Sequence, residues 1–140
     1  MDIELFENKI LTENVKVFIL CSPHNPVGRV WTKKELQAVL DICKKYGVYV
    51  IADEIHQDII MSGYEKVTAA TCGNYDEYLI TLTSASKSFN IAGFQCAYAI
   101  IPNAKMREDY DRLAKKLHFT EGNSFSYIAT QAVYLSLIHI

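Results

Sequence analysis

A strand–helix–strand pattern near the start of the chain constrains its fold most. Two apolar runs, Val15–Cys21 and Val48–Ala52, are rich in β-branched and aromatic residues and show little polar alternation, which is typical of strands covered on both faces. Between them, Thr32 and Glu35 have the spacing of a capping box, and Gly47 follows the predicted helix. Because one helix joins the two strands, we expect a parallel pair with a right-handed crossover.

The rest of the chain continues this alternation. Two further apolar runs, Leu79–Thr83 and Cys96–Ile101, predict strands. Helices are expected from about Ala104 to Leu117 and from near Ser124 to the end of the chain, and residues 1–14 contain part of a helix pattern. The sequence therefore predicts an α/β layer structure.

Composition excludes several classes of protein. The chain has 140 residues, half of them apolar, which is enough for one core but too few to indicate two domains. A net charge of −2 gives no reason to expect nucleic acid or an anionic membrane as a partner, and no apolar run approaches the ~20 residues of a membrane span. The acidic, mixed N-terminus does not resemble a signal peptide.

The cysteines predict neither disulfides nor a zinc site. Cys21, Cys43, Cys72 and Cys96 stand far apart and form no Cys-x-x-Cys pair, and most lie in or beside apolar stretches where cysteine is a small buried residue. A reducing, cytoplasmic location fits this pattern best.

Polar side chains follow three of the predicted strands. Asn25 lies after the first strand in a turn that contains two prolines and a glycine, Asp53 and His56 follow the second, and Ser84 and Lys87 follow the third. Each has an ordinary alternative, such as a structured turn, an Asp cap or a solvated lysine. Because open α/β sheets gather the carboxyl ends of their strands, these five side chains are expected to meet in one crevice.

The same motifs contain groups that also occur in two other kinds of site. Asp53, His56 and Asp58 carry metal-ligating groups, but no second ligand cluster with suitable spacing occurs elsewhere in the chain, so no metal is expected. The hydroxyl residues and lysine of Ser84–Lys87 are suited to a phosphate, but no Walker-type glycine pattern accompanies them, which argues against a nucleotide site.

In this order, the three motifs resemble those of fold-type I pyridoxal 5'-phosphate (PLP) enzymes of the class I/II aminotransferase family. Ser22–Trp31 and Asp53–His56 are similar to the cystathionine β-lyase, or C–S lyase, branch. Related transaminases more often carry Asn at the position of His24 and Tyr at that of His56. The resemblance covers the chain up to about Tyr134.

The resemblance implies a three-layer α/β large domain whose mostly parallel sheet contains one antiparallel strand. Residues 1–140 would form its central portion, with an N-terminal segment and a C-terminal small domain outside this sequence. It also implies a PLP cofactor, a small amino-acid substrate and a homodimer at full length. Alone, residues 1–140 are expected to bind PLP poorly and to be inactive.

The resemblance assigns the two central roles to Lys87 and Asp53. Lys87 would be the Schiff-base lysine and would remove the α-proton of the substrate, since a desolvated lysine readily loses its own proton. Asp53 would face the pyridine nitrogen of PLP, where its negative charge keeps that nitrogen protonated.

The resemblance implies roles for four further positions, and a fifth departs from the family pattern. Asn25 would contact the phenolic oxygen of PLP, and His56 stands where aminotransferases place a tyrosine that contacts the same oxygen. Ser84 matches a phosphate-binding position, with Ser86 as a second candidate. Gln95 replaces an arginine that aminotransferases carry eight residues after the lysine and that the C–S lyase branch often lacks, so the phosphate loses a bidentate partner.

Three functions follow as hypotheses. The first is PLP-dependent β-elimination from cystathionine or a related cysteine S-conjugate, giving a thiol, pyruvate and ammonia. Transamination is the alternative, because it uses the same residues. A non-catalytic binding or regulatory protein with this fold is a third, against which the presence of both Lys87 and Asp53 argues.

Overall fold

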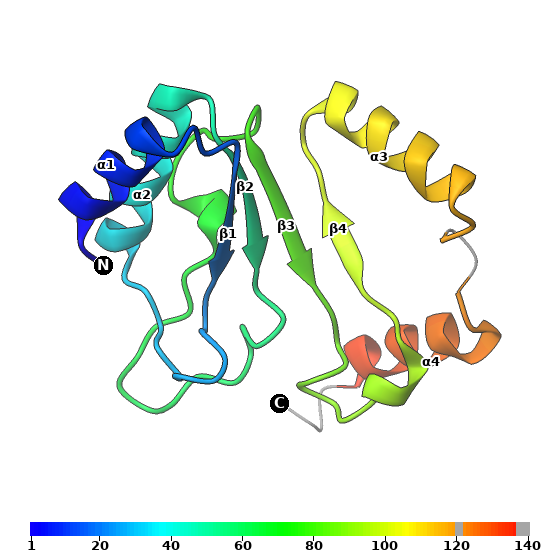
Figure 1. The fold of residues 1–140 in the computed structure, drawn as a ribbon. Coiled ribbons are helices and arrows are strands. Elements are labelled where there is room, and N and C mark those ends of the chain that lie inside the picture. Colours follow the sequence, from blue (N-terminus) through cyan, green and yellow to red (C-terminus); the bar gives the residue numbers. More distant parts are fainter. Residues whose placement is uncertain (120–121, 137–140) are drawn as a thin grey trace.

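The computed structural model describes residues 1–119 and 122–136, in which helices and strands alternate around one sheet (Figure 1). The helices are α1 (Ile3–Thr12), α2 (Lys33–Tyr46), α3 (Ala104–Lys116) and α4 (Ser124–Leu135), with two 3-10 helices, η1 (Ala69–Thr71) and η2 (Ala92–Phe94). The strands are β1 (Val17–Cys21), β2 (Tyr49–Asp53), β3 (Leu79–Thr83) and β4 (Tyr98–Ile100). No helix in the described part of the chain is long and apolar enough to cross a membrane.

The four strands form one mixed sheet in the order β1-β2-β3-β4. β1, β2 and β3 are parallel and β4 runs antiparallel to β3, which confirms the expected sheet with one antiparallel strand (Figure 1). The register pairs Cys21 with Asp53, and Asp53 with Leu82. The carboxyl ends of the three parallel strands therefore lie side by side at one end of the sheet.

Three predicted strands differ from the observed ones at their ends. β1 begins at Val17, two residues after the predicted start at Val15, and β2 begins at Tyr49, one residue after the predicted Val48. β2 continues through Asp53 because the Asp53 carbonyl still accepts from Ser22 N (3.1 Å), so this residue ends the strand instead of following it. The strand predicted over Cys96–Ile101 is shorter, since only three of its residues pair with β3. The helix predicted from Ser124 ends at Leu135, and residues 137–140 of that prediction lie outside the described residues.

The hydrophobic core lies on the face of the sheet that α1 and α2 cover (Figure 1). Strand residues Leu20, Val50 and Leu79 are each at most 2 % exposed there. The buried stripe of α2 packs on them through Leu36, Val39, Leu40 and Cys43. Burial of such side chains stabilises the fold by roughly 1.5–3 kcal/mol each.

The opposite face of the sheet is apolar and accessible. Ile19 is 68 % exposed, and Val17 and Tyr49 on the same face are also exposed. Side chains alternate between the two faces of a strand, so these residues point away from the core that Leu20 and Val50 form. In the part of the chain that the structure describes, helices bury only one face of these strands.

The start of α2 is fixed by the capping box that the sequence predicts. The Thr32 hydroxyl accepts from Glu35 N (3.3 Å), and Glu35 Oε2 accepts from Thr32 N (2.9 Å). The Glu35 carboxylate accepts hydrogen bonds from Thr32 N, from the Thr32 hydroxyl (2.8 Å) and from Arg29 (2.6 Å), and these bonds lower its pKa to about 2. Gly47 ends the helix at φ 66°, in the left-handed region that favours glycine.

We expect Thr32→Ala to lower the free energy of unfolding by about 1 kcal/mol, because Glu35 N loses its acceptor at the helix start and Glu35 Oε2 loses the hydroxyl donor. Urea denaturation of the full-length protein measures the effect. Thr12→Ala is the matched control: Thr12 is also exposed, and its hydroxyl bonds only the Asn8 carbonyl within α1, so the change should stay within about 0.5 kcal/mol. Equal effects of the two substitutions would contradict the capping role.

Candidate functional site

The site is built on the carboxyl end of β2. Asp53, the last residue of this strand, is half-buried between the ends of β1 and β3. Its Oδ1 accepts from Ile55 N (3.2 Å), which holds the carboxylate against the start of the following loop. None of the ion pairs among the described residues involves Asp53, so no described cationic side chain lies within ion-pair distance of its carboxylate.

The loop after β1 carries Asn25 and is folded back on its own strand. The Trp31 indole Nε1 donates to the Cys21 carbonyl (3.2 Å), and a short bridge joins His24 N to the Arg29 carbonyl (2.8 Å). Within this bridge, Gly28 has φ 75°, which explains a glycine at that turn. Asn25 is exposed at the tip of the loop.

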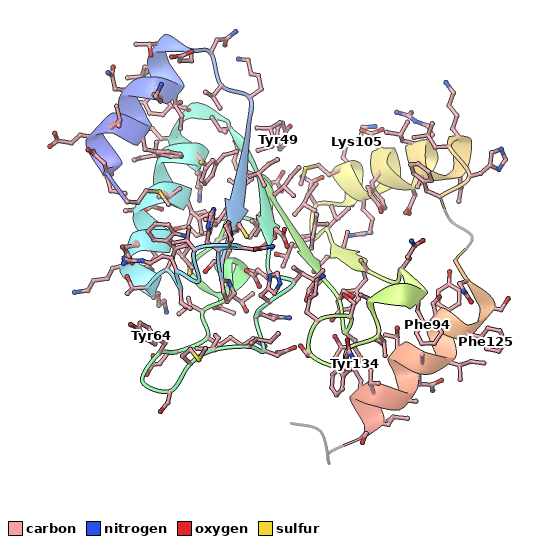
Figure 2. The ribbon with its side chains drawn as sticks, turned by 60° about the horizontal axis from the view of Figure 1, so that its bottom comes forward. Tyr49, Tyr64, Phe94, Lys105, Phe125 and Tyr134 are labelled. Carbon is pink, nitrogen blue, oxygen red and sulfur yellow. The ribbon has the colours of Figure 1, made fainter. Side chains whose placement is uncertain are left out.

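Asn25 and His56 line one cavity of about 450 Å³. The rest of the cavity wall comes from the proline-rich loop and from the loop after β2, in which Tyr64 is labelled in Figure 2. The residues of this part of the wall are Pro23, His24, Pro26, Gly28, Val30, Ile59, Met61 and Tyr64. His56 Nδ1 is buried and has no hydrogen-bond partner among the residues that the structure describes. A buried polar atom without a partner is costly, and a ligand group in this cavity could satisfy it.

The turn after β3 presents Lys87 and buries the residues before it. Ser84, 2 % exposed, donates from its hydroxyl to the Cys96 carbonyl (2.5 Å) and accepts from Ser86 N (3.0 Å). Ser86 is also buried, whereas Lys87 is exposed. The Ser84 hydroxyl thus holds the shape of the turn in this structure, and the cavity with Asn25 and His56 is not lined by Ser84, Ser86 or Lys87.

The structure therefore brings the predicted residues to one end of the sheet in two groups. Asn25 and His56 share the cavity, and Asp53 ends the strand that precedes His56. Ser84, Ser86 and Lys87 lie in the adjacent turn, which the Gln57 side chain joins through its bond to Thr83 Oγ1 (2.9 Å).

The metal alternative finds no support in the described residues. They contain no group of three or more His, Cys, Asp or Glu side chains that could hold an ion. The Asp58 carboxylate instead contacts Lys66 Nζ (2.9 Å) and the Ser88 hydroxyl (3.0 Å). Cys21, Cys43, Cys72 and Cys96 are free thiols.

Sequence reasoning missed Glu54, a buried carboxyl next to Asp53. Glu54 is 3 % exposed, and its Oε1 accepts from Ala69 N (2.7 Å), which ties η1 to the end of β2. Desolvation raises the pKa of this carboxyl above its ordinary value of 4.5, against the lowering effects of the Ala69 and Thr68 hydrogen bonds and the Lys66 charge. The alternation of the strand is the signal that could have revealed it, since the residue after Asp53 must point toward the core.

Comparison with known proteins identifies the family. The family model described as aminotransferase class I and II matches residues 1–137. The chain belongs to this family.

Solved and curated members of the family are similar over nearly all of the chain. Cystathionine beta-lyase PatB from Bacillus subtilis (strain 168) is 34% identical, in an alignment that covers 96% of this chain and 35% of PatB. The PLP-bound C-S lyase from Staphylococcus hominis has a TM-score of 0.88 at 39% identity, covering 97% of this chain and 34% of the lyase. A PLP-bound protein from Clostridium difficile 630 has a TM-score of 0.92 at 44% identity, with 97% and 35% covered.

These relatives are much longer than the chain, which spans about a third of the length of PatB. The likeness to the two solved structures covers 97% of the chain. It confirms the resemblance to PLP-dependent aminotransferase-fold enzymes that the three motifs predict.

We expect Glu54→Gln to flatten the pH dependence of stability. The folded state binds the Glu54 proton more tightly than the unfolded state, so stability is fully present below pH 4.5 and falls as the pH rises through the raised pKa. The amide oxygen of glutamine can still accept from Ala69 N and does not titrate. One group changes the slope by at most about 1.4 kcal/mol per pH unit.

Urea denaturation of the full-length protein at a series of pH values above 4.5 measures this slope. Glu65→Gln is the control, since Glu65 lies on the same loop but is exposed. If the stability curves of Glu54→Gln and the unmodified protein run parallel, the buried carboxyl does not titrate as described.

Proposed function

We propose that this chain is part of a PLP-dependent carbon–sulfur β-lyase that acts on cystathionine or related cysteine S-conjugates. The observation that carries the proposal is the register of β1, β2 and β3, which aligns Asp53, the last residue of β2, with the strand ends that precede Asn25 and Lys87. His24 and His56, the two positions that favour the lyase branch, line the same cavity. PatB and the Staphylococcus hominis enzyme, both lyases by name, support the same choice.

The residues present fit PLP. The buried, unpartnered His56 Nδ1 and the side chain of Asn25 line one cavity, and both can hydrogen-bond a phenolic oxygen. Asp53 supplies a negative charge that no described cationic side chain neutralises, as a partner for a pyridinium nitrogen must. Ser84 and Ser86 are the proposed phosphate contacts; the Ser84 hydroxyl, now bonded to Cys96, would share that bond or turn toward the phosphate.

When bound, PLP supplies an electron sink for the negative charge that develops at the substrate α-carbon. Lys87 would hold the cofactor, and its free amine would take the α-proton of the substrate. Asp53 keeps the pyridine nitrogen protonated by its charge. Asn25 and His56 orient the ring through its phenolic oxygen.

Elimination then requires a leaving group at the β-carbon. The Cβ–S bond breaks with its electron pair on sulfur, and the thiolate is protonated and leaves as a thiol. The remaining three-carbon product takes up one water and yields pyruvate and ammonia. Lys87, having taken the α-proton, is the proposed donor to the leaving sulfur.

We further propose that residues 1–140 are the central portion of a PLP-binding large domain, with an N-terminal segment and a small domain in the same protein. The exposed apolar face around Ile19 supports this, because large apolar patches of this kind are usually covered. A homodimer at full length and a cytoplasmic location are proposed with it; the free thiols agree with a reducing compartment.

Product analysis with L-cystathionine tests the reaction. The full-length protein, loaded with PLP, should release pyruvate and homocysteine in equal amounts, because each Cβ–S cleavage yields one of each. Amino transfer to an added keto acid, without either product, would move the assignment to transamination. That second candidate is supported by the description of the matched family, which names aminotransferases.

Lys87→Ala tests the catalytic assignment. We expect the rate of β-elimination to fall by about 10²–10⁴, the typical contribution of a positioned acid–base group, and the visible absorbance of bound PLP to change. Lys105→Ala is the control, because Lys105 is a surface lysine of α3 paired with Asp109 (Figure 2). Unchanged activity and absorbance in Lys87→Ala would leave a non-catalytic binding protein as the better explanation.

A further inference from the structure

The turn that carries Lys87 is tied to the loop after β2 on both sides of the lysine. Gln57 Nε2 donates to Thr83 Oγ1 (2.9 Å) at the end of β3. On the other side, Asp58 Oδ2 accepts from the hydroxyl of Ser88 (3.0 Å), which directly follows Lys87. Two consecutive residues of one loop therefore reach both ends of the turn.

The second oxygen of Asp58 is used within its own loop. Oδ1 accepts from Lys66 Nζ (2.9 Å), eight residues further along the chain, where the loop returns toward η1. This ion pair orients the carboxylate and leaves Oδ2 directed at Ser88. The side chains of Asp58 and Lys66 are 33% and 47% exposed, and exposed pairs of this kind add little to global stability.

The two halves of the turn are held in different ways. Ser84 fixes the first half through its bonds to Ser86 N and to the Cys96 carbonyl. In the second half, the Phe89 ring packs edge-on against Tyr134 of α4, with centroids 6.1 Å apart (Tyr134 is labelled in Figure 2). Ser88 lies between these two anchors, and its hydroxyl donates a hydrogen bond to Asp58.

We propose that Asp58 is a positioning residue for Lys87 and acts through Ser88. The lysine side chain is a flexible chain of four carbons. The position of its amine therefore depends on a fixed backbone at residues 87 and 88. A displacement of about 1 Å between reacting groups can cost 10²-fold in rate. The inference rests on the proposed function, in which Lys87 is the reacting amine, and adds the element that holds it in place.

Asp58→Ala and Ser88→Ala, made singly and together in the full-length protein, test the proposal. Each single substitution should lower kcat for β-elimination from L-cystathionine about tenfold and leave KM within about twofold. The double variant should be no slower than either single one, because both remove the same contact. Amide hydrogen exchange in residues 84–91 should quicken about tenfold in all three, while exchange in α2 does not change.

Asp109→Ala is the matched control. Asp109 is also an exposed carboxylate that contacts two side chains, Lys105 (3.0 Å) and Arg112 (2.7 Å), but it lies on α3. It should leave both kcat and the exchange of residues 84–91 unchanged. If Asp58→Ala does not fold, Ser88→Ala carries the test, since it keeps the Asp58–Lys66 ion pair. A tenfold loss of kcat with faster exchange in Ser88→Ala supports the proposal.

The outcomes separate this proposal from the proposed function. Unchanged kcat and unchanged exchange in either single variant overturn the positioning role. A double variant that is about a hundredfold slower overturns it as well, because the two residues would then act independently. If the unmodified protein releases no pyruvate, the lyase assignment fails; quicker exchange of residues 84–91 would still support the Asp58–Ser88 tie, and unchanged exchange would overturn it.

Discussion

β2 is hydrogen-bonded along both of its edges, and the rest of the site depends on this pairing. Near its end, the Asp53 carbonyl accepts from Ser22 N (3.1 Å), and Glu54 N donates to the Leu82 carbonyl (2.9 Å). The three parallel strands thus end at the same level, and the loops that carry the functional side chains start next to one another. A shift of one residue in this register would turn Asp53 to the opposite face of the sheet.

Each of these loops is then fixed by a bond between a side chain and the main chain. The Trp31 indole bonds the Cys21 carbonyl, Glu54 bonds Ala69 N, and the Ser84 hydroxyl bonds the Cys96 carbonyl. One partner in each bond is backbone, and Cys21 belongs to the sheet itself. Such bonds restrict the motion of the loops at this end of the sheet, which would otherwise be mobile.

Local features of the fold could be predicted from the sequence, and contacts between distant segments could not. The capping box joins Thr32 to Glu35 within one turn, so the spacing of the two residues was enough. The partners of Asp58 lie 8 and 30 residues away, and nothing in its own neighbourhood distinguishes it from a solvated aspartate. The inward bond of Ser84 likewise depends on where Cys96 returns to the sheet, twelve residues later.

The neighbouring carboxyls Asp53 and Glu54 show how the alternation of a strand separates two tasks. Asp53 lies on the face of Ile51, where its charge is available to a ligand, whereas Glu54 points to the core and bonds Ala69 N. If both carboxylates lay on the same face of the strand, their mutual repulsion would disfavour the charged form of one of them. Desolvation of the Glu54 carboxyl lowers stability, whereas its bond to Ala69 N keeps η1 against the end of the strand. Glu54 therefore anchors η1 from the core side of the strand, and Asp53 lies on the other side.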